Sequence, residues 1–260
     1  MADFLDILVR DAEKTIAKGY YKVDDDRKVT RHLSLKDTIT KCKHVPIITE
    51  IKPSSPSHGN LRIIKDVRDI AGAMERGGAS GTSVLTEPKY FSGSIEMLKE
   101  VKRTVNLPVL MKDIIIDPVQ IEAASKIGAD AILLIFSVFR RGYVGYSVQD
   151  MIKIAHSKRL EVLLETHDAA EFLSALETEA DLVGINNRNL ETLKVDLEVT
   201  RQIMSVVGEC GKVVVSESGI QKPEDIRFLR ACGVKAFLIG SAIMLANNIE
   251  EKVRELVHAL

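Results

Sequence analysis

The chain has 260 residues, 45% of them hydrophobic, and its 36 basic residues nearly balance 37 acidic ones. This balance gives no electrostatic reason to expect nucleic acid as the main partner. The three cysteines are far apart and show no metal-ligand spacing, so reduced thiols are expected. The amino terminus mixes charged with apolar residues, and no apolar run approaches the roughly 20 residues that span a bilayer. We therefore expect a soluble cytoplasmic protein without a membrane partner.

Short apolar runs recur along the chain, and longer amphipathic stretches separate them. The eight runs are VPIITEI (45–51), GTSVLT (81–86), PVLMKD (108–113), AILLIF (131–136), EVLLE (161–165), DLVGIN (181–186), KVVVSE (212–217) and VKAFLIG (234–240). Several are apolar at both even and odd positions, which is typical of parallel strands that helices cover on both faces.

The stretches between the runs carry helix start and stop signals. Segments 117–128 and 222–233 each place Pro early and Gly at the end, and segments 168–180 and 196–207 each begin with Asp as the expected N-cap. Alternating strands and helices predict an α/β fold with a parallel sheet. Eight units fit a (β/α)8 TIM barrel better than a doubly wound sheet, because the loop after the first run lacks GxGxxG.

Residues 1–44 precede the repeat. Apolar residues recur there at helical spacing: Phe4, Leu5, Leu8, Ala12 and Ile16. A second short helix begins after Ser34, in a pattern that resembles a capping box. We expect these extra N-terminal helices to cover the bottom or one flank of the barrel. The whole chain, 1–260, is then one domain, in which 45–260 form the barrel.

Charged and amide side chains end most of the runs. In barrels of this type the active site lies at the carboxyl ends of the strands. The residues found there are Glu50, Lys52, Lys112, Glu165, Asn186, Arg188 and Glu217. Any one of them could simply be leaving the core for water. As a set, however, buried lysines and carboxylates need partners, and mutual pairing shifts pKa values as proton transfer requires. We interpret the set as a catalytic centre.

The turns after the seventh and eighth runs predict a phosphate site. Gly219 and Gly240 let the backbone approach an anion, and Ser241 adds a hydroxyl at the start of a short extra helix. The loop 52–60 is rich in Pro, Ser and Gly and suits a lid, with Lys52 and Ser55 as donors. The alternative is that these are ordinary turns and a plain surface loop.

Other polar residues are less informative. The guanidinium of Arg188 suits a carboxylate, although this residue could also lie on the surface. His58 and His167 are interpreted as solvent-facing or loop residues. No group of His, Cys, Asp and Glu has convincing ligand spacing, so no metal is predicted.

Together these motifs resemble the indole-3-glycerol phosphate synthase family. The matching segments are EIKPSSPSHG (50–59), SVLTEPKYFSGS (83–94), PVLMKDIIIDP (108–118), ADAILLI (129–135), LLETH (163–167), GINNRNLETLKVD (184–196), SESGI (216–220) and FLIGSAIM (237–244). The N-terminal helices also match the family's extra cap. Three positions depart from the family pattern: Ile114 stands where Phe is often found, His58 where Lys is common, and Thr166 where Val is common.

The resemblance implies a carboxy-lyase of tryptophan biosynthesis. It would convert 1-(2-carboxyphenylamino)-1-deoxyribulose 5-phosphate into indole-3-glycerol phosphate by ring closure, decarboxylation and dehydration, without cofactor or metal. By motif, Lys112 would be the principal general acid and Glu165 the general base of dehydration. Lys52 would contact the substrate and support proton transfer, and Glu50 and Glu217 would orient the lysines.

The resemblance also implies which residues bind the substrate. Asn186 and Arg188 would hold it, with Arg188 near its carboxylate. The substrate-binding residues would further include Ser218 and Phe91, which would flank the aromatic ring. The phosphate would be received by Ser55, Gly219, Gly240 and Ser241. The expected partner is therefore a small phosphorylated molecule, bound by a monomer or weak oligomer.

Three alternatives remain open from the sequence. A Schiff-base aldolase would also bind phosphate and use a lysine, but usually on the sixth strand, which here offers Asn186. Phosphoribosylanthranilate isomerase is a nearer relative, but its pattern ends the first strand with Cys, whereas this strand ends Glu50-Ile51-Lys52. A barrel that only binds a phosphorylated metabolite or serves in assembly would tend to lose the charges that this chain keeps.

Overall fold

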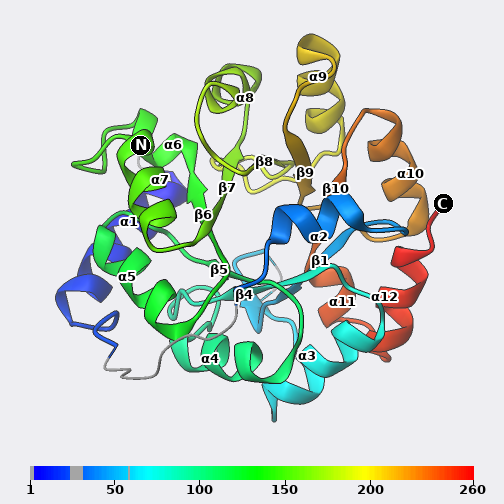
Figure 1. Cartoon of the computed structure of the whole chain (residues 1–260), viewed down its shortest axis with the longest axis horizontal. Helices are drawn as coiled ribbons and strands as arrows, with labels where there is room; N and C mark the ends of the chain where they lie inside the picture. The colour runs from blue at the N-terminus through cyan, green and yellow to red at the C-terminus, as the bar shows by residue number, and fades with distance from the viewer. Residues whose placement is uncertain (1–2, 24–31, 58) are drawn as a thin grey trace.

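The eight predicted runs form eight parallel strands that close into a barrel in the computed structural model (Figure 1). The structure describes residues 3–23, 32–57 and 59–260. The strands of the barrel are β1 (Ile47–Ile51), β4 (Gly81–Leu85), β5 (Val109–Lys112), β6 (Ala131–Ile135), β7 (Glu161–Thr166), β8 (Leu182–Asn186), β9 (Val213–Glu217) and β10 (Ala236–Ile239). The barrel closes where β1 pairs in parallel with both β10 and β4. A short antiparallel pair, β2 (Ser54–Ser55) with β3 (Gly59–Asn60), lies in the loop after β1.

Helices surround the strands in Figure 1, as the alternating pattern predicts. The longer ones after β1 are α3 (Val67–Arg76), α4 (Ile95–Thr104), α5 (Pro118–Ile127), α7 (Val148–Ser157), α8 (Ala169–Leu176), α9 (Glu198–Val207), α10 (Pro223–Ala231) and α12 (Ile249–Val257). Two short helices directly follow strands: α6 (Phe136–Arg140) after β6 and α11 (Ser241–Met244) after β10. The predicted short helix before the final one is therefore present.

The predicted helix signals agree with the observed ends, with one exception. Asp117 caps α5, and Gly128 ends it in the left-handed conformation at φ 93°. Asp168 is the N-cap of α8, and its side chain accepts the backbone N–H of Glu171. At α9 the N-cap is Leu197 and not Asp196, so the predicted cap was wrong by one position. Asp196 still accepts a hydrogen bond from the backbone N–H of Glu198 at 3.0 Å, which stabilises the same helix end.

Alternate residues of each strand belong to two apolar clusters. On β6, Ile132 and Leu134 pack against the surrounding helices, whereas Leu133 belongs to the cluster inside the barrel. The same alternation places Leu163 of β7 inside. Each fully buried side chain of this size contributes about 1.5–3 kcal/mol to folding. Some polar residues near the carboxyl ends of the strands occupy inward-facing positions. The same alternation directs their side chains into the mouth of the barrel.

The two N-terminal helices, α1 (Phe4–Ala17) and α2 (Leu35–Lys41), lie at opposite ends of the barrel. α2 covers the amino ends of the strands: Ser34 donates to Glu161 Oε1 at 2.5 Å, at the first residue of β7. α1 contacts loops at the carboxyl ends, where Asp11 Oδ2 lies 2.6 Å from Lys89 Nζ in the loop after β4. The expected placement at the bottom or flank is confirmed for α2 and wrong for α1, because helical periodicity defines an apolar face but not its docking site.

Within the part of the chain that the structure describes, no helix has the length and apolar character needed to cross a membrane.

Candidate active site

A cavity of about 720 Å³ opens at the carboxyl ends of the barrel strands. It is lined by all thirteen residues that the sequence proposed for the site: Glu50, Lys52, Ser55, Phe91, Lys112, Glu165, Asn186, Arg188, Glu217, Ser218, Gly219, Gly240 and Ser241. Barrel closure is what brings these residues together, since they come from segments up to 191 positions apart in the chain, from 50 to 241. The volume is typical of a pocket for a small organic ligand.

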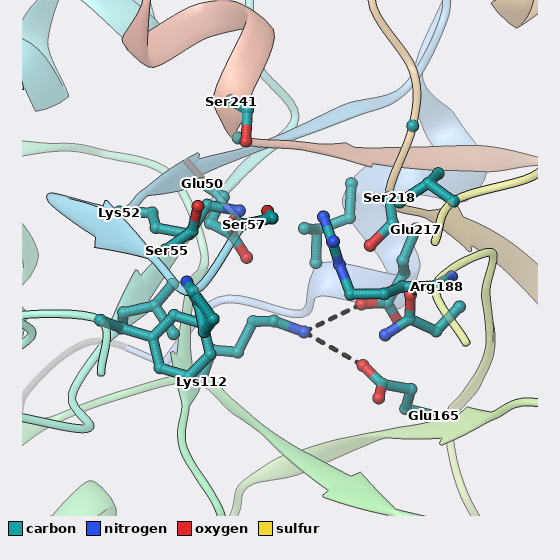
Figure 2. A pocket seen from close by; sticks show the side chains of 18 of the residues that line it. Glu50, Lys52, Ser55, Ser57, Lys112, Glu165, Arg188, Glu217, Ser218 and Ser241 are labelled. Atoms are coloured by element: carbon teal, nitrogen blue, oxygen red, sulfur yellow. Dashed lines mark hydrogen bonds and ion pairs between the residues drawn. The ribbon is translucent and has the colours of Figure 1, made fainter. Parts of the chain in front are cut away.

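Lys112 is the centre of the charged side of this cavity. It ends β5, and its Nζ lies 3.0 Å from Glu217 Oε2 and 3.2 Å from Glu165 Oε2 (Figure 2). With Glu50, these residues come from β1, β5, β7 and β9, which are alternate strands around the barrel. Side chains from alternate strands form a single layer in such barrels. The layer at the mouth therefore contains one ammonium group and three carboxyl groups.

The electrostatic balance of this layer differs at each position. Burial alone would lower the pKa of Lys112, but the charges of Glu217, Glu165 and Glu50 outweigh it and raise that pKa above its usual range. Burial would raise the pKa of Glu165, but Lys112 and then His167 lower it well below its usual range. At Glu217 burial prevails, with help from the charge of Glu165, and raises the pKa to about 7. The pKa values of two glutamates in one layer are thus shifted in opposite directions, as in acid–base catalysts.

Glu50 forms a second ion pair, with Lys52. Glu50 Oε1 lies 2.5 Å from Lys52 Nζ, and both side chains are largely buried. Gly240 leaves room for this pair, because a Cβ there would lie 2.3 Å from Glu50 Oε1. Gly184 of β8 does the same for Glu217, whose Oε1 would lie 2.3 Å from an added Cβ. The predicted reason for Gly240 was access for phosphate, and the structure adds that this glycine makes space for Glu50.

The turns after β9 and β10 also line the cavity. Ser218 and Gly219 both adopt left-handed backbone conformations, at φ 67° and 88°. Gly240 is the N-cap of α11, and Ser241 is its first residue. In the loop after β1, the hydroxyl of Ser55 is buried and has no hydrogen-bond partner among the described residues. Figure 2 shows Ser55, Ser218 and Ser241 above Lys112 in the view.

Asn186 and Arg188 come from the end of β8 and the loop after it, and both line the cavity. Asn186 ends β8, and its Oδ1 accepts the backbone N–H of Arg188 at 3.0 Å. The Arg188 side chain points into the cavity (Figure 2), and one of its terminal nitrogens donates to the carbonyl of Leu193 at 2.8 Å. Burial lowers the pKa of Arg188, although Glu50 opposes the shift. A guanidinium remains charged despite such a shift, so it suits an anionic ligand group.

Apolar side chains form a further part of the cavity lining, called here the apolar wall. Its residues are Phe4, Leu5 and Leu8 of α1, together with Phe91, Ile114 and Leu133. Phe4 is held in place by an edge-to-face contact with Tyr90, whose ring centroid is 5.4 Å away. The sequence predicted Phe91 but not the part played by α1. Ile114 keeps this wall apolar where the family often has Phe. Thr166, a second departure, is buried at the end of β7, and His58, the third, falls outside the described residues.

Two polar residues near the cavity were misjudged or missed in the sequence. His167 was expected to be a solvent-facing or loop residue; it lies in the bend directly after β7, but its side chain is only 10% exposed and its Nε2 lies 3.3 Å from Glu165 Oε1. Strand alternation could have indicated this, since His167 is two positions beyond the inward-facing Glu165. The buried amide of Asn187 donates to the backbone carbonyls of Glu217 and Ser218 at 3.0 and 3.1 Å. It thereby fixes the end of β9, for which the Asn doublet after β8 was the available signal.

Comparison with known proteins identifies the family. The family model described as indole-3-glycerol phosphate synthase matches residues 7–256. This chain belongs to that family. The indole-3-glycerol phosphate synthase of Methanocaldococcus jannaschii is 44% identical over 252 residues, covering 95% of this chain and 92% of the relative. The synthase of Methanopyrus kandleri is 45% identical over 219 residues, covering 83% of this chain and 84% of the relative.

Solved structures of other enzymes share the fold of this indole-3-glycerol phosphate synthase family member. The thiamine phosphate pyrophosphorylase of Pyrococcus furiosus superimposes with a TM-score of 0.61 at 19% identity, over 86% of this chain and 96% of that one. The N-acetylmannosamine-6-phosphate 2-epimerase of Clostridium perfringens gives 0.62 at 16% identity, over 83% and 93%. At these identities the likeness concerns the barrel fold alone.

Proposed function

We propose that this chain is an indole-3-glycerol phosphate synthase that acts on 1-(2-carboxyphenylamino)-1-deoxyribulose 5-phosphate, in tryptophan biosynthesis. The observation that carries the proposal is the position of Lys112 between Glu165 and Glu217, in a cavity that is also lined by the apolar wall and by serine and glycine turns. This cavity offers proton-transfer groups, a surface for an aromatic ring and a place for an anion. The proposed substrate contains all three matching parts.

Lys112 is the proposed general acid for ring closure. The surrounding carboxylates keep its ammonium group protonated throughout the neutral range, so a proton is available when the ring carbon attacks the ketone. An alkoxide is far more basic than the ketone from which it forms, which makes the transfer favourable as the carbon–carbon bond develops. Lys52, paired with Glu50, contacts the substrate from the loop side and supports proton transfer.

Glu165 is the proposed general base for dehydration, which needs an acid at the leaving hydroxyl and a base at the ring proton. Its low pKa keeps it ionised before the reaction. The substrate carboxylate is lost as carbon dioxide once ring attack has interrupted the aromatic system. Burial of that carboxylate favours this step, because an anion loses hydration inside the cavity. Arg188 and Asn186 hold the substrate, with Arg188 next to the carboxylate.

The phosphate end is proposed to bind between the loop after β1 and the turns after β9 and β10. Ser55 and Ser241 provide hydroxyls, and Gly219 and Gly240 allow close approach of the backbone. Ser218, in the same turn as Gly219, contacts the sugar part of the substrate. Anchoring both ends of the molecule converts binding energy into alignment of the reacting carbons. Phe91 and the α1 side chains then flank the aromatic ring.

The test is turnover of the proposed substrate by the purified chain, followed by indole absorbance and fluorescence. The chain has no Trp, so the indole emission belongs to the product. Product formation is expected. Binding of the substrate without product would contradict the proposed reaction and favour a binding role. A borohydride-trapped adduct would favour a Schiff-base aldolase, although the protonated state of Lys112 makes it a poor nucleophile.

A further inference from the structure

A largely buried histidine contacts the proposed general base from outside the cavity lining. His167 follows β7, and its ring is held between two carboxyl groups. Nε2 is 3.3 Å from Glu165 Oε1, and Nδ1 is 3.5 Å from Glu171 Oε2. These are ion-pair distances rather than aligned hydrogen bonds, and neither nitrogen has a hydrogen-bond partner within the described residues. Two adjacent carboxylates favour the positively charged form of an imidazole.

Glu171 is itself fixed from three directions. It lies in the first turn of α8 with a fully buried side chain. Its Oε1 accepts the Ser137 hydroxyl at 2.5 Å and lies 3.0 Å from an Arg140 terminal nitrogen. Its Oε2 accepts the backbone N–H of His167 at 2.8 Å. Glu171 therefore cannot turn away from His167 without losing these contacts, and it provides a rigid anchor for the ring.

We infer that His167 is a positioning residue for Glu165, which it holds by one carboxylate oxygen against the anchor at Glu171. The inference rests on the proposed function, since it assigns a partner to the proposed base. Glu165 has its Oε2 next to Lys112 and its Oε1 next to His167, so both oxygens are restrained. Without His167 the carboxylate loses this restraint on Oε1, while Lys112 and Asn186 still interact with it, and it is less firmly aligned with the proton that it must remove. Such alignment governs the rate of proton transfer.

The charged groups around His167 determine the pH range over which it is protonated and restrains Glu165. They are Glu165 of β7, with Lys112 of β5 beyond it, Glu171 of α8, Arg140 of α6 behind Glu171, and Asp168, which pairs with Arg140 at 2.8 Å. Burial alone would lower the pKa of His167, but Glu165 and Glu171 raise it to about 9 from the model-compound value of 6.5. Because the folded pKa is raised, His167 stays protonated and paired with Glu165 through neutral pH, and this ion pair is lost as the pH rises through about 9.

His167→Asn tests the inference, with His156→Asn as the matched control. His156 of α7 also pairs with a carboxylate, Asp181 at 2.9 Å, but lies outside the cavity. Asn keeps a donor but has no charge. We expect His167→Asn to lower kcat by about 10- to 100-fold, with KM changed by less than about threefold. The wild-type kcat should fall as the pH rises through about 9, and His167→Asn should lack that alkaline limb. His156→Asn should match the wild type in both respects.

A second variant and a spectroscopic measurement make the test independent of the first variant's folding. Glu171→Gln keeps the shape of the anchor but removes its charge, so the alkaline limb should move below pH 9, toward 6.5. Histidine NMR of the wild type should show one ring titrating near pH 9, absent in His167→Asn. The inference would be overturned if His167→Asn kept the kcat and the alkaline limb of the wild type. It would also be overturned if His167 titrated at or below pH 6.5 in the wild-type protein. Absence of product from the wild type would instead refute the proposed function, and the NMR titration would still test the imidazolium.

Discussion

Lys112→Ala removes the ammonium group that lies 3.0 Å from Glu217 and 3.2 Å from Glu165. A positioned general acid contributes about 10²- to 10⁴-fold to a rate. At about 1.36 kcal/mol per factor of ten, this corresponds to a rise in the activation barrier of about 2.7–5.4 kcal/mol. We expect kcat to fall by this factor. KM should change little, because the ring and phosphate contacts come from other residues.

The same substitution also affects stability, so a matched control is needed. Removing one partner of a buried ion pair costs about 3–5 kcal/mol, since a charge remains without its partner. Lys102→Ala provides the comparison: Lys102 Nζ lies 2.5 Å from Asp130, with side chains 13% and 0% exposed. For Lys112 and Glu217 these values are 16% and 1%. The Lys102 pair lies at the amino ends of the strands, where Asp130 also accepts the backbone N–H of Val109, the first residue of β5.

Both variants should therefore lose a similar free energy of unfolding, and only Lys112→Ala should lose turnover. The assay is indole fluorescence under saturating substrate, with kcat expressed per folded molecule from a urea unfolding curve of each variant. The reasoning is refuted if Lys112→Ala keeps kcat within about threefold of the wild type. It is also refuted if Lys102→Ala loses turnover to the same extent, because the effect would then follow stability rather than proton donation.

Three other substitutions probe separate parts of the cavity. Arg188→Ala should raise KM by about 10- to 100-fold with a smaller change in kcat, because a charged hydrogen bond contributes about 1.5–3 kcal/mol. An unchanged KM in initial-rate measurements would contradict the contact of Arg188 with the substrate carboxylate. Phe4→Ala should raise KM by about 2- to 12-fold through loss of an aromatic contact of about 0.5–1.5 kcal/mol, and titration calorimetry with a non-reacting aromatic analogue should show the same loss. Because burial raises the pKa of Glu217 to about 7, its ionised form is lost as the pH falls below 7. The kcat/KM of the wild type should therefore decline below pH 7, and the pH–rate profile of Glu217→Gln should lack this acidic limb.

The charged layer could be predicted from the sequence because barrel topology leaves few choices. Once the eight runs are recognised as parallel strands, their carboxyl ends must meet at one end of the barrel. Alternation then decides which side chains point inward: Leu110 of β5 is inside, so Lys112 follows it inward, and Val215 of β9 does the same for Glu217. What alternation does not provide is the distance between strands that are not neighbours. The sequence therefore predicted the members of the layer but not that Lys112 bridges two glutamates.

The position of α1 could not be predicted by the same reasoning. Its apolar face was correctly recognised, but either end of a barrel offers apolar surface to such a helix. The contacts that fix its position are long-range and polar: Asp11 with Lys89, and Asp6 with Arg141 at 3.0 Å. Charged residues of both signs occur throughout the sequence, and nothing in their spacing marks those that will pair. As a result, the apolar wall around Phe4 was found in the structure and not in the sequence.

Glu165 and Glu217 show that burial alone does not decide the behaviour of a carboxyl group. Both are almost completely buried, both occupy inward-facing positions near the carboxyl ends of alternate strands, and both contact Lys112. One ammonium group cannot favour two ionised carboxylates equally in so little space, because the two negative charges also oppose each other. His167 makes the two carboxyl groups unequal, because it contacts Glu165 and stabilises the negative charge on that residue. The choice of which glutamate serves as a ready base is therefore made by a side chain behind the site and by its anchor, Glu171.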